Sequence, residues 1–241
     1  NSKKNNDKQQ RFECLKVLLS YGADPRRKHH NGTGDTPLEW LRKQSDLDQG
    51  QEKCKEYLEW IQAYENKPDE KLKKLCKDDF WKHKKTTKER VAQLRKMKEV
   101  LETNGEAGSA QREAYVNQLF SKGTTALVSL AGVPKSCTDE RLSGVKLLLE
   151  NGAWPNIRTD SHNYPLFKAV WYAGKGGWKI CEALLKHGAM NAWHQLQKNN
   201  LLQLKSKSSA TRGPFTLEQI VMQGPHRKEL EHGYTSWLSA V

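Results

Sequence analysis

The sequence predicts an all-α protein built as a solenoid of stacked helix pairs, and three observations support this fold class. Every strong hydrophobic pattern has a period near 3.6 residues, as in an amphipathic helix. A helix that ends in Gly-Ala occurs three times along the chain. The composition is polar, with 36% hydrophobic residues and a mean hydropathy of -0.88. A solenoid suits this balance, because each repeat shares only a thin core with its neighbours.

The three repeated helix ends lie at Cys14–Pro25, Gly144–Pro155 and Ile180–Asn191. In each copy, apolar residues at helical spacing lead to a Gly-Ala pair. We expect Gly22, Gly152 and Gly188 to adopt the left-handed conformation that ends a helix, because only glycine reaches it without steric cost. The following alanine stays small because the chain folds back against its own helix.

A second motif, interpreted as a helix start, follows at a fixed delay. It is found as Thr36-Pro37-Leu38 and Tyr164-Pro165-Leu166, with degenerate copies at 125–131 and 200–204. A capping residue, then proline in the first turn and an inward leucine, favours the start of a helix. Both landmarks repeat after 36 residues, from Gly152 to Gly188 and from Pro165 to Leu201.

These motifs resemble the ankyrin-repeat family, whose units run from a TPLH-type helix start through a second helix to Gly-Ala and a β-turn, with a period of about 33 residues. The resemblance covers residues 12–64 and 123–205. The repeats are divergent, because the usual histidine of the helix start is replaced by Glu39, Val128, Phe167 and Gln203. The resemblance implies a scaffold that binds a partner protein through its turn tips and first-helix face.

The chain divides into four segments: 1–66, N-terminal repeats of which the first is partial; 67–122, an irregular basic helical insertion; 123–213, further repeats; and 214–241, a capping segment. The expected helices of the repeats are 12–20, 37–45 with 51–65, 125–132 with 138–150, 165–173 with 178–186, and 200–207 with 216–222. In the insertion, Thr86-x-x-Glu89 predicts a capping box and Ser109 a further helix cap. Asn104-Gly105 and Gly123 are the expected helix stops.

Positive charge is concentrated in the insertion. Residues Lys67–Lys98 hold 13 Lys and Arg against 5 Asp and Glu, which is +8 of the formal +13. The basic patch is assigned to Lys73, Lys74, Lys82, Lys84 and Lys85. It has two interpretations: a solvated helix face, or a surface for nucleic acid or an acidic protein. The pair Phe80-Trp81 favours an interaction surface, because aromatic rings among lysines are costly in a merely solvated face.

Partner-binding residues are expected at the turn tips, near 26–33, 158–163 and 192–199. The candidates are Arg26, Arg27, His30, Trp154, His162, Trp193 and His194. Trp154 and Trp193 follow the Gly-Ala stops, so they either cover helix ends or serve as aromatic anchors, a role that Trp often takes in interfaces.

No pattern predicts catalysis, a cofactor or a metal. Gly174-Lys175-Gly176-Gly177 lacks the order of a phosphate-binding loop. His29 and His30 are adjacent and have no evident third ligand. The five cysteines are scattered singly, which favours free thiols in a reducing compartment. We therefore expect a protein that is not an enzyme.

The expected partner is a protein of unknown identity, bound by a monomer without a membrane span. The start of the sequence, residues 1–11, is polar and predicts no secretory signal, so an intracellular place is expected, cytoplasmic or nuclear. Two alternatives remain: binding of nucleic acid or ribonucleoprotein through residues 67–98, and a regulatory segment of a larger enzyme. The Lys/Asn-rich, interrupted repeats also resemble effectors that intracellular bacteria or viruses deliver into host cells.

Circular dichroism tests the predicted fold class. We expect a mostly helical spectrum, because every strong pattern has a helical period. A strand content above roughly a fifth of the residues, the average for globular domains, would contradict the helical solenoid.

Overall fold

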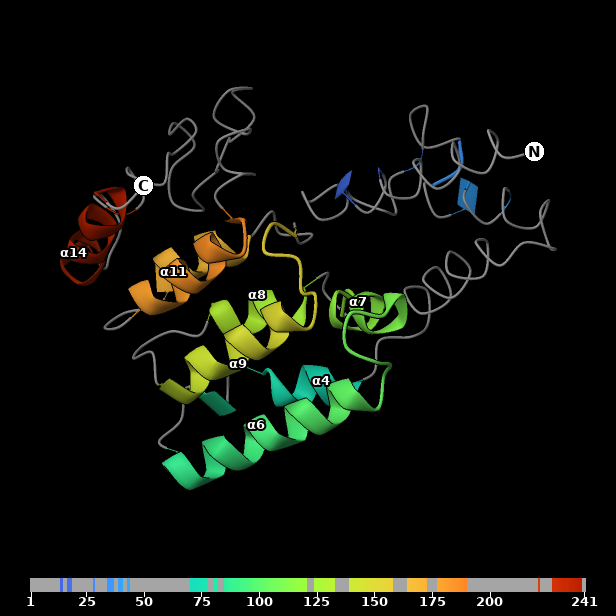
Figure 1. The fold of residues 1–241 in the computed structure, drawn as a ribbon, viewed down its shortest axis with the longest axis horizontal. Helices are drawn as coiled ribbons and strands as arrows, with labels where there is room; N and C mark the ends of the chain where they lie inside the picture. Colours follow the sequence, from blue (N-terminus) through green and yellow to red (C-terminus); the bar gives the residue numbers. More distant parts are fainter. Residues whose placement is uncertain are drawn as a thin grey trace.

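The computed structural model of the chain is helical (Figure 1). It describes residues 14, 17–18, 28, 34–36, 39–40, 43, 70–77, 80–81, 85–120, 124–132, 139–157, 164–172, 177–189, 221 and 227–239. Its helices are α4 (Glu70–Leu75), α6 (Thr87–Glu102), α7 (Ala110–Val116), α8 (Ala126–Ala131), α9 (Asp139–Glu150), α10 (Pro165–Tyr172), α11 (Trp178–Lys186) and α14 (Arg227–Leu238).

The all-α prediction is confirmed for the residues that the structure describes. Among them there is no strand, only an isolated bridge between Phe120 and Thr124. The helix pairs predicted at 125–132 with 138–150 and at 165–173 with 178–186 appear as α8 with α9 and α10 with α11. The pair predicted at 200–207 with 216–222, and most of residues 1–66, lie outside the described residues.

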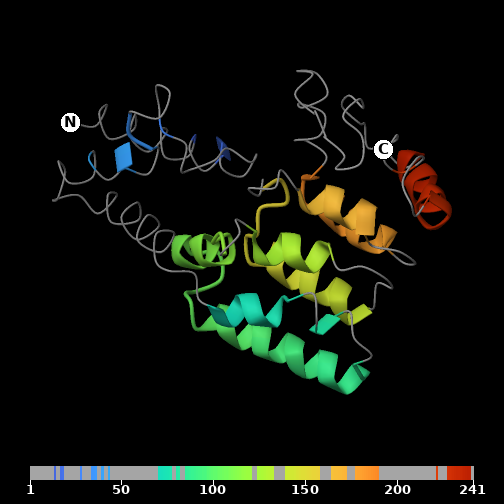
Figure 2. The same cartoon turned by 180° about the vertical axis from the view of Figure 1, so that it is seen from behind.

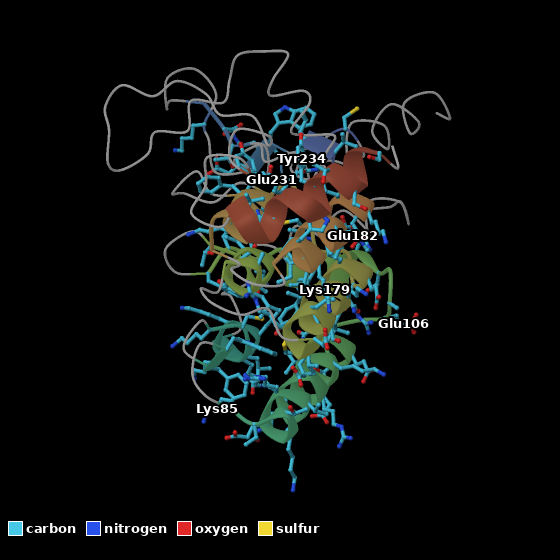
Figure 3. The ribbon with its side chains drawn as sticks, turned by 90° about the vertical axis from the view of Figure 1, so that its left-hand side faces the viewer. Lys85, Glu106, Lys179, Glu182, Glu231 and Tyr234 are labelled. Atoms are coloured by element: carbon cyan, nitrogen blue, oxygen red, sulfur yellow. The ribbon has the colours of Figure 1, made fainter. Side chains whose placement is uncertain are left out.

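The described helices are stacked in layers around one core. Figure 3 shows α14, α11, α9 and α6 one above another, and each of them packs on the next. On one side of this stack, α4 packs against α6, α8 against α9, and α10 against both α8 and α11. Seen from behind, the same order is visible (Figure 2). The buried residues of all these layers form a single hydrophobic cluster, to which Met97, Leu148 and Leu184 belong.

The segment 67–122 contributes to this core. Its helix α6 packs on α9, and Leu72, Met97 and Leu101 are buried in the same cluster as the residues of α8–α11. The α4–α6 pair is also held by polar contacts, because Gln93 Nε2 and Trp81 Nε1 both donate to the carbonyl of Leu75 at 3.0 Å. The pair therefore forms the end layer of the stack.

Helix α6 begins at the predicted capping box. The amide of Glu89 donates to the hydroxyl of Thr86 at 3.2 Å, and the amide of Thr86 donates to the Glu89 carboxylate at 2.8 Å. The Thr86 amide, and then its hydroxyl, lower the pKa of the Glu89 carboxyl. Because the folded pKa lies below the unfolded one, this stabilisation is complete above the unfolded pKa and is lost as the pH falls through the folded pKa.

The predicted helix stops at Gly152 and Gly188 have the expected geometry. Their φ angles are 87° and 88°, in the left-handed region. After α9, the amide of Ala153 donates to Leu148 O at 3.0 Å, which closes the last turn in the manner of a Schellman motif. Gly105, at the end of α6, also has a positive φ of 113°. Gly22 and Gly123 lie outside the described residues.

Successive turns are joined by asparagine amides. Nδ2 of Asn117 donates to the carbonyl of Gly152 at 2.8 Å, and Nδ2 of Asn156 donates to the carbonyl of Gly188 at 3.0 Å. The carbonyl of a left-handed glycine is thus held each time from the preceding turn. The two links are of the same kind, and each joins neighbouring turns along this edge.

Helix α14, in the segment 214–241, packs on α11. The contact centres on Gly233, where a Cβ atom would overlap the indole ring of Trp178. Tyr234 meets the same indole edge-on, with ring centroids 6.0 Å apart. Leu230 and Tyr234 are buried, whereas Thr235 and Ser236 are exposed, so α14 turns a polar face outward.

The two helix stops give a stability test. We expect Gly152→Val and Gly188→Val each to lower the free energy of unfolding by more than about 1 kcal/mol, because valine is strained at positive φ. Chemical denaturation of both variants measures this. The control is Ala92→Val on the exposed face of α6, which should cost about 0.7 kcal/mol or less in helix propensity. If both glycine variants are as stable as the wild type, the helix stops are wrongly placed.

Candidate functional site

The basic patch is built by α4 and the start of α6. Lys74 is exposed on α4, and Lys73 and Lys85 are partly exposed. Lys82 and Lys84 lie outside the described residues. Lys85 is already engaged, since its Nζ lies 3.4 Å from the Glu89 carboxylate and 5.8 Å from the centre of the Phe80 ring.

The aromatic pair between the lysine clusters belongs to the core. Trp81 is buried, and its indole N–H is bound to the carbonyl of Leu75. Phe80 packs against the core and meets Trp81 edge-on, with the ring centroids 5.5 Å apart. The two rings therefore do not indicate an interaction surface, and only the charge of the segment supports one.

Three basic residues of the segment 67–98, besides the five lysines of the basic patch, lie on the outer face of α6: Lys88, Arg95 and Lys96, all exposed. The sequence contains a pattern that indicates the exposed position of these three residues. The capping box fixes where α6 begins, and the apolar residues Leu94 and Met97 mark its inner face, so the helical period places these three cations on the other side.

Trp154 covers a junction inside the protein. Its side chain is 6% exposed, and its indole N–H donates to the Glu113 carboxylate of α7 at 2.9 Å. Its amide donates to Asn117 Oδ1 at 2.8 Å. Of the two interpretations of this residue, the geometry favours the covering of a helix end.

Arg112 of α7 adds to the same junction. Its Nη1 donates to Asn151 Oδ1 at 2.9 Å, and both Nε and Nη2 donate to the carbonyl of Gly105. Together with Trp154, this contact ties α7 to the end of α9. The remaining candidates at the turn tips lie outside the described residues: Arg26, Arg27, His30, His162, Trp193 and His194.

Two kinds of chemical site can be judged in the described residues, a metal centre and a cysteine nucleophile. No group of three or more His, Cys, Asp or Glu side chains among them is arranged to hold a metal ion. Burial raises the pKa of the Cys76 thiol to about 12, so this sulfur stays protonated at neutral pH and is a poor nucleophile. In the described part of the chain, no helix is long and apolar enough to cross a membrane.

Comparisons with protein-family models, with curated proteins and with solved structures find no match for this chain. Function is therefore inferred from the residues and their geometry.

The role of Trp154 can be measured. We expect Trp154→Ala to lower the free energy of unfolding by about 3 kcal/mol or more, because it removes a buried aromatic side chain. Trp154→Phe keeps a ring but loses the bond to Glu113, and should cost less. Lys74→Gln is the control, with a change below about 0.5 kcal/mol. If Trp154→Ala has the same free energy of unfolding as the wild type, the indole does not stabilise the fold.

Proposed function

We propose that this chain is a protein-binding scaffold of the ankyrin-repeat type. A partner protein contacts the edge formed by the turns and by the first helices of the pairs. The proposal is supported above all by the repeated turn, in which a left-handed glycine ends the second helix and its carbonyl is held by the asparagine of the preceding turn. Repeated layers of this kind present a continuous edge on which a partner can bind.

The first helices fit this role because their inner faces fill the core and their outer positions stay accessible. In α8, Ser129 is partly exposed, whereas Leu127, Val128 and Leu130 are buried. In α10, Lys168 is partly exposed beside the buried Leu166 and Ala169, whereas Phe167 packs against the core. Side chains at these outer positions can change with little effect on the core, as a binding surface requires.

The alternative of a regulatory segment within a larger enzyme has no observation in its favour. Nucleic-acid binding rests on the basic segment alone. No exposed ring is found there for base stacking among the described residues, because Trp81 is buried and Phe80 packs under Lys85.

The experiment is affinity capture from cell lysate with crosslinking, using the full chain. We expect the double variant Ser129→Arg with Lys168→Glu to lose the captured partner, because it adds bulk and reverses charge on the first-helix face. The control, Lys146→Glu with Lys186→Glu, alters exposed lysines of the second helices and should retain the partner. Thermal melting must show both variants folded.

Two outcomes would contradict this function. In the first, the partner is captured equally by both variants, which would exclude the first-helix face as the contact. In the second, capture disappears after nuclease treatment of the lysate, which would indicate binding of nucleic acid instead.

A further inference from the structure

The outer face of α6 is a second surface with its own chemical character. Leu94 and Met97 face α9, since both lie within 4 Å of a Cβ built on Gly144. On the opposite side of α6, Lys88, Arg95 and Lys96 are exposed. Figure 3 shows α6 at one end of the stack, with α14 at the other end. The outer face of α6 is thus an end surface of the described protein.

The ion pairs of α6 leave a positive excess on this face. Glu89 is paired with Lys85 and Glu102 with Lys98, at 3.4 and 3.7 Å. Within the described part of the chain, no carboxylate forms an ion pair with Lys88, Arg95 or Lys96. The neighbouring α4 contributes the exposed Lys74, and the exposed Lys77 follows the end of this helix. Glu99, an exposed carboxylate one turn from Arg95 and Lys96, offsets part of this charge, and an excess of positive charge remains.

Helix α11 shows a different arrangement of charges, in which each lysine has a carboxylate partner. On α11, Lys179 lies 3.0 Å from the carboxylate of Asp139, and Lys186 lies 2.8 Å from that of Glu182. Both lysines of α11 are exposed, yet both have a carboxylate partner. The exposed lysines of α11 thus differ from the three cations of α6, for which no ion pair is found among the described residues.

The same face of α6 carries apolar surface between its charges. Val91 is 36% exposed and Ala92 is exposed, and they lie between Lys88 and Arg95 along the helix. A partner that covered Val91 and Ala92 would bury apolar area while its carboxylates met the flanking cations. Apolar contact combined with complementary charge is how helical partners recognise each other.

The charges also decide between a protein and a nucleic acid. A phosphate backbone is uniformly negative and gains most from an unbroken basic surface. The surface of α6 also holds the exposed carboxylates of Glu89, Glu99 and Glu102, which would repel it. A protein helix can place its own acidic and apolar residues to match this mixed pattern.

We propose that the outer face of α6 binds a carboxylate-rich amphipathic helix of a partner protein. Lys88, Arg95 and Lys96 bind the carboxylates, and Val91 with Ala92 contacts the apolar row. This surface is separate from the first-helix edge, so the inference stands or falls independently of the function proposed above.

The test uses fluorescence anisotropy with the full chain and two labelled probes. One is a helical peptide of Glu, Leu and Ala, and the other is duplex DNA of random sequence. The α6 variant is Lys88→Glu, Arg95→Glu and Lys96→Glu. The matched control, Lys146→Glu, Lys179→Glu and Lys186→Glu, changes the net charge by the same amount on exposed positions of α9 and α11. A Gln version of the α6 variant covers the case that charge reversal impairs folding.

We expect the wild type to bind the peptide more tightly than the duplex. The α6 variant should weaken peptide binding by at least about tenfold, while the control stays close to the wild type. Binding to the wild type should weaken between about 50 and 200 mM salt, and Val91→Glu should also weaken it. These results would support the proposal.

Three results would overturn it. Equal weakening by the α6 variant and by the control would show that only the net charge matters. Tighter binding of the duplex, lost in the α6 variant, would assign the face to nucleic acid. Absence of peptide binding by the folded wild type would remove the surface altogether. None of these results affects capture of a partner through the first-helix edge, so failure here is distinguishable from failure of the scaffold function.

Discussion

The buried guanidinium of Arg141 holds the helices α8 and α9 together. This side chain of α9 is 1% exposed, and it donates from Nε to Leu130 O at 2.9 Å and from Nη2 to Ala131 O at 2.7 Å. Both carbonyls lie at the end of α8, where the partial negative charge of the helix dipole favours a cation. A charge buried without such partners would be strongly destabilising. The contact therefore fixes α8 on α9, and α9 in turn supports α6 and α11.

The close packing around α9 depends on a residue without a side chain. A Cβ at Gly144 would lie 2.9 Å from Leu130 and 3.2 Å from Leu94, so α8 and α6 both approach α9 at this point. Arg141 and Gly144 lie within one turn of each other on α9. Three helices thus meet around one short stretch of chain, which explains why the segment 67–122 belongs to the same core as the helices after it.

The local part of this structure could be predicted from the sequence. The capping box at Thr86, the caps at Ser109 and Thr125, and the stops at Gly152 and Gly188 depend on residues within a few positions of each other. Most of the candidate site could not be predicted in this way. The burial of Trp154 depends on Glu113, which is 41 residues away in the chain. Arg112 and Asn117 likewise bind turns that only the three-dimensional arrangement brings near.

The glycine at the centre of α14 has a consequence for how the end of the protein is assembled. Because the indole of Trp178 occupies the space where a Cβ would be, α14 can dock only where a glycine faces that ring. If α14 slid by about one turn along its axis, Leu230 or Ser236 would meet the indole and collide with it. A helix held by apolar contacts alone could settle in several registers. The Gly233–Trp178 contact allows a single register, and it thereby sets which residues of α14 face the solvent at this end of the molecule.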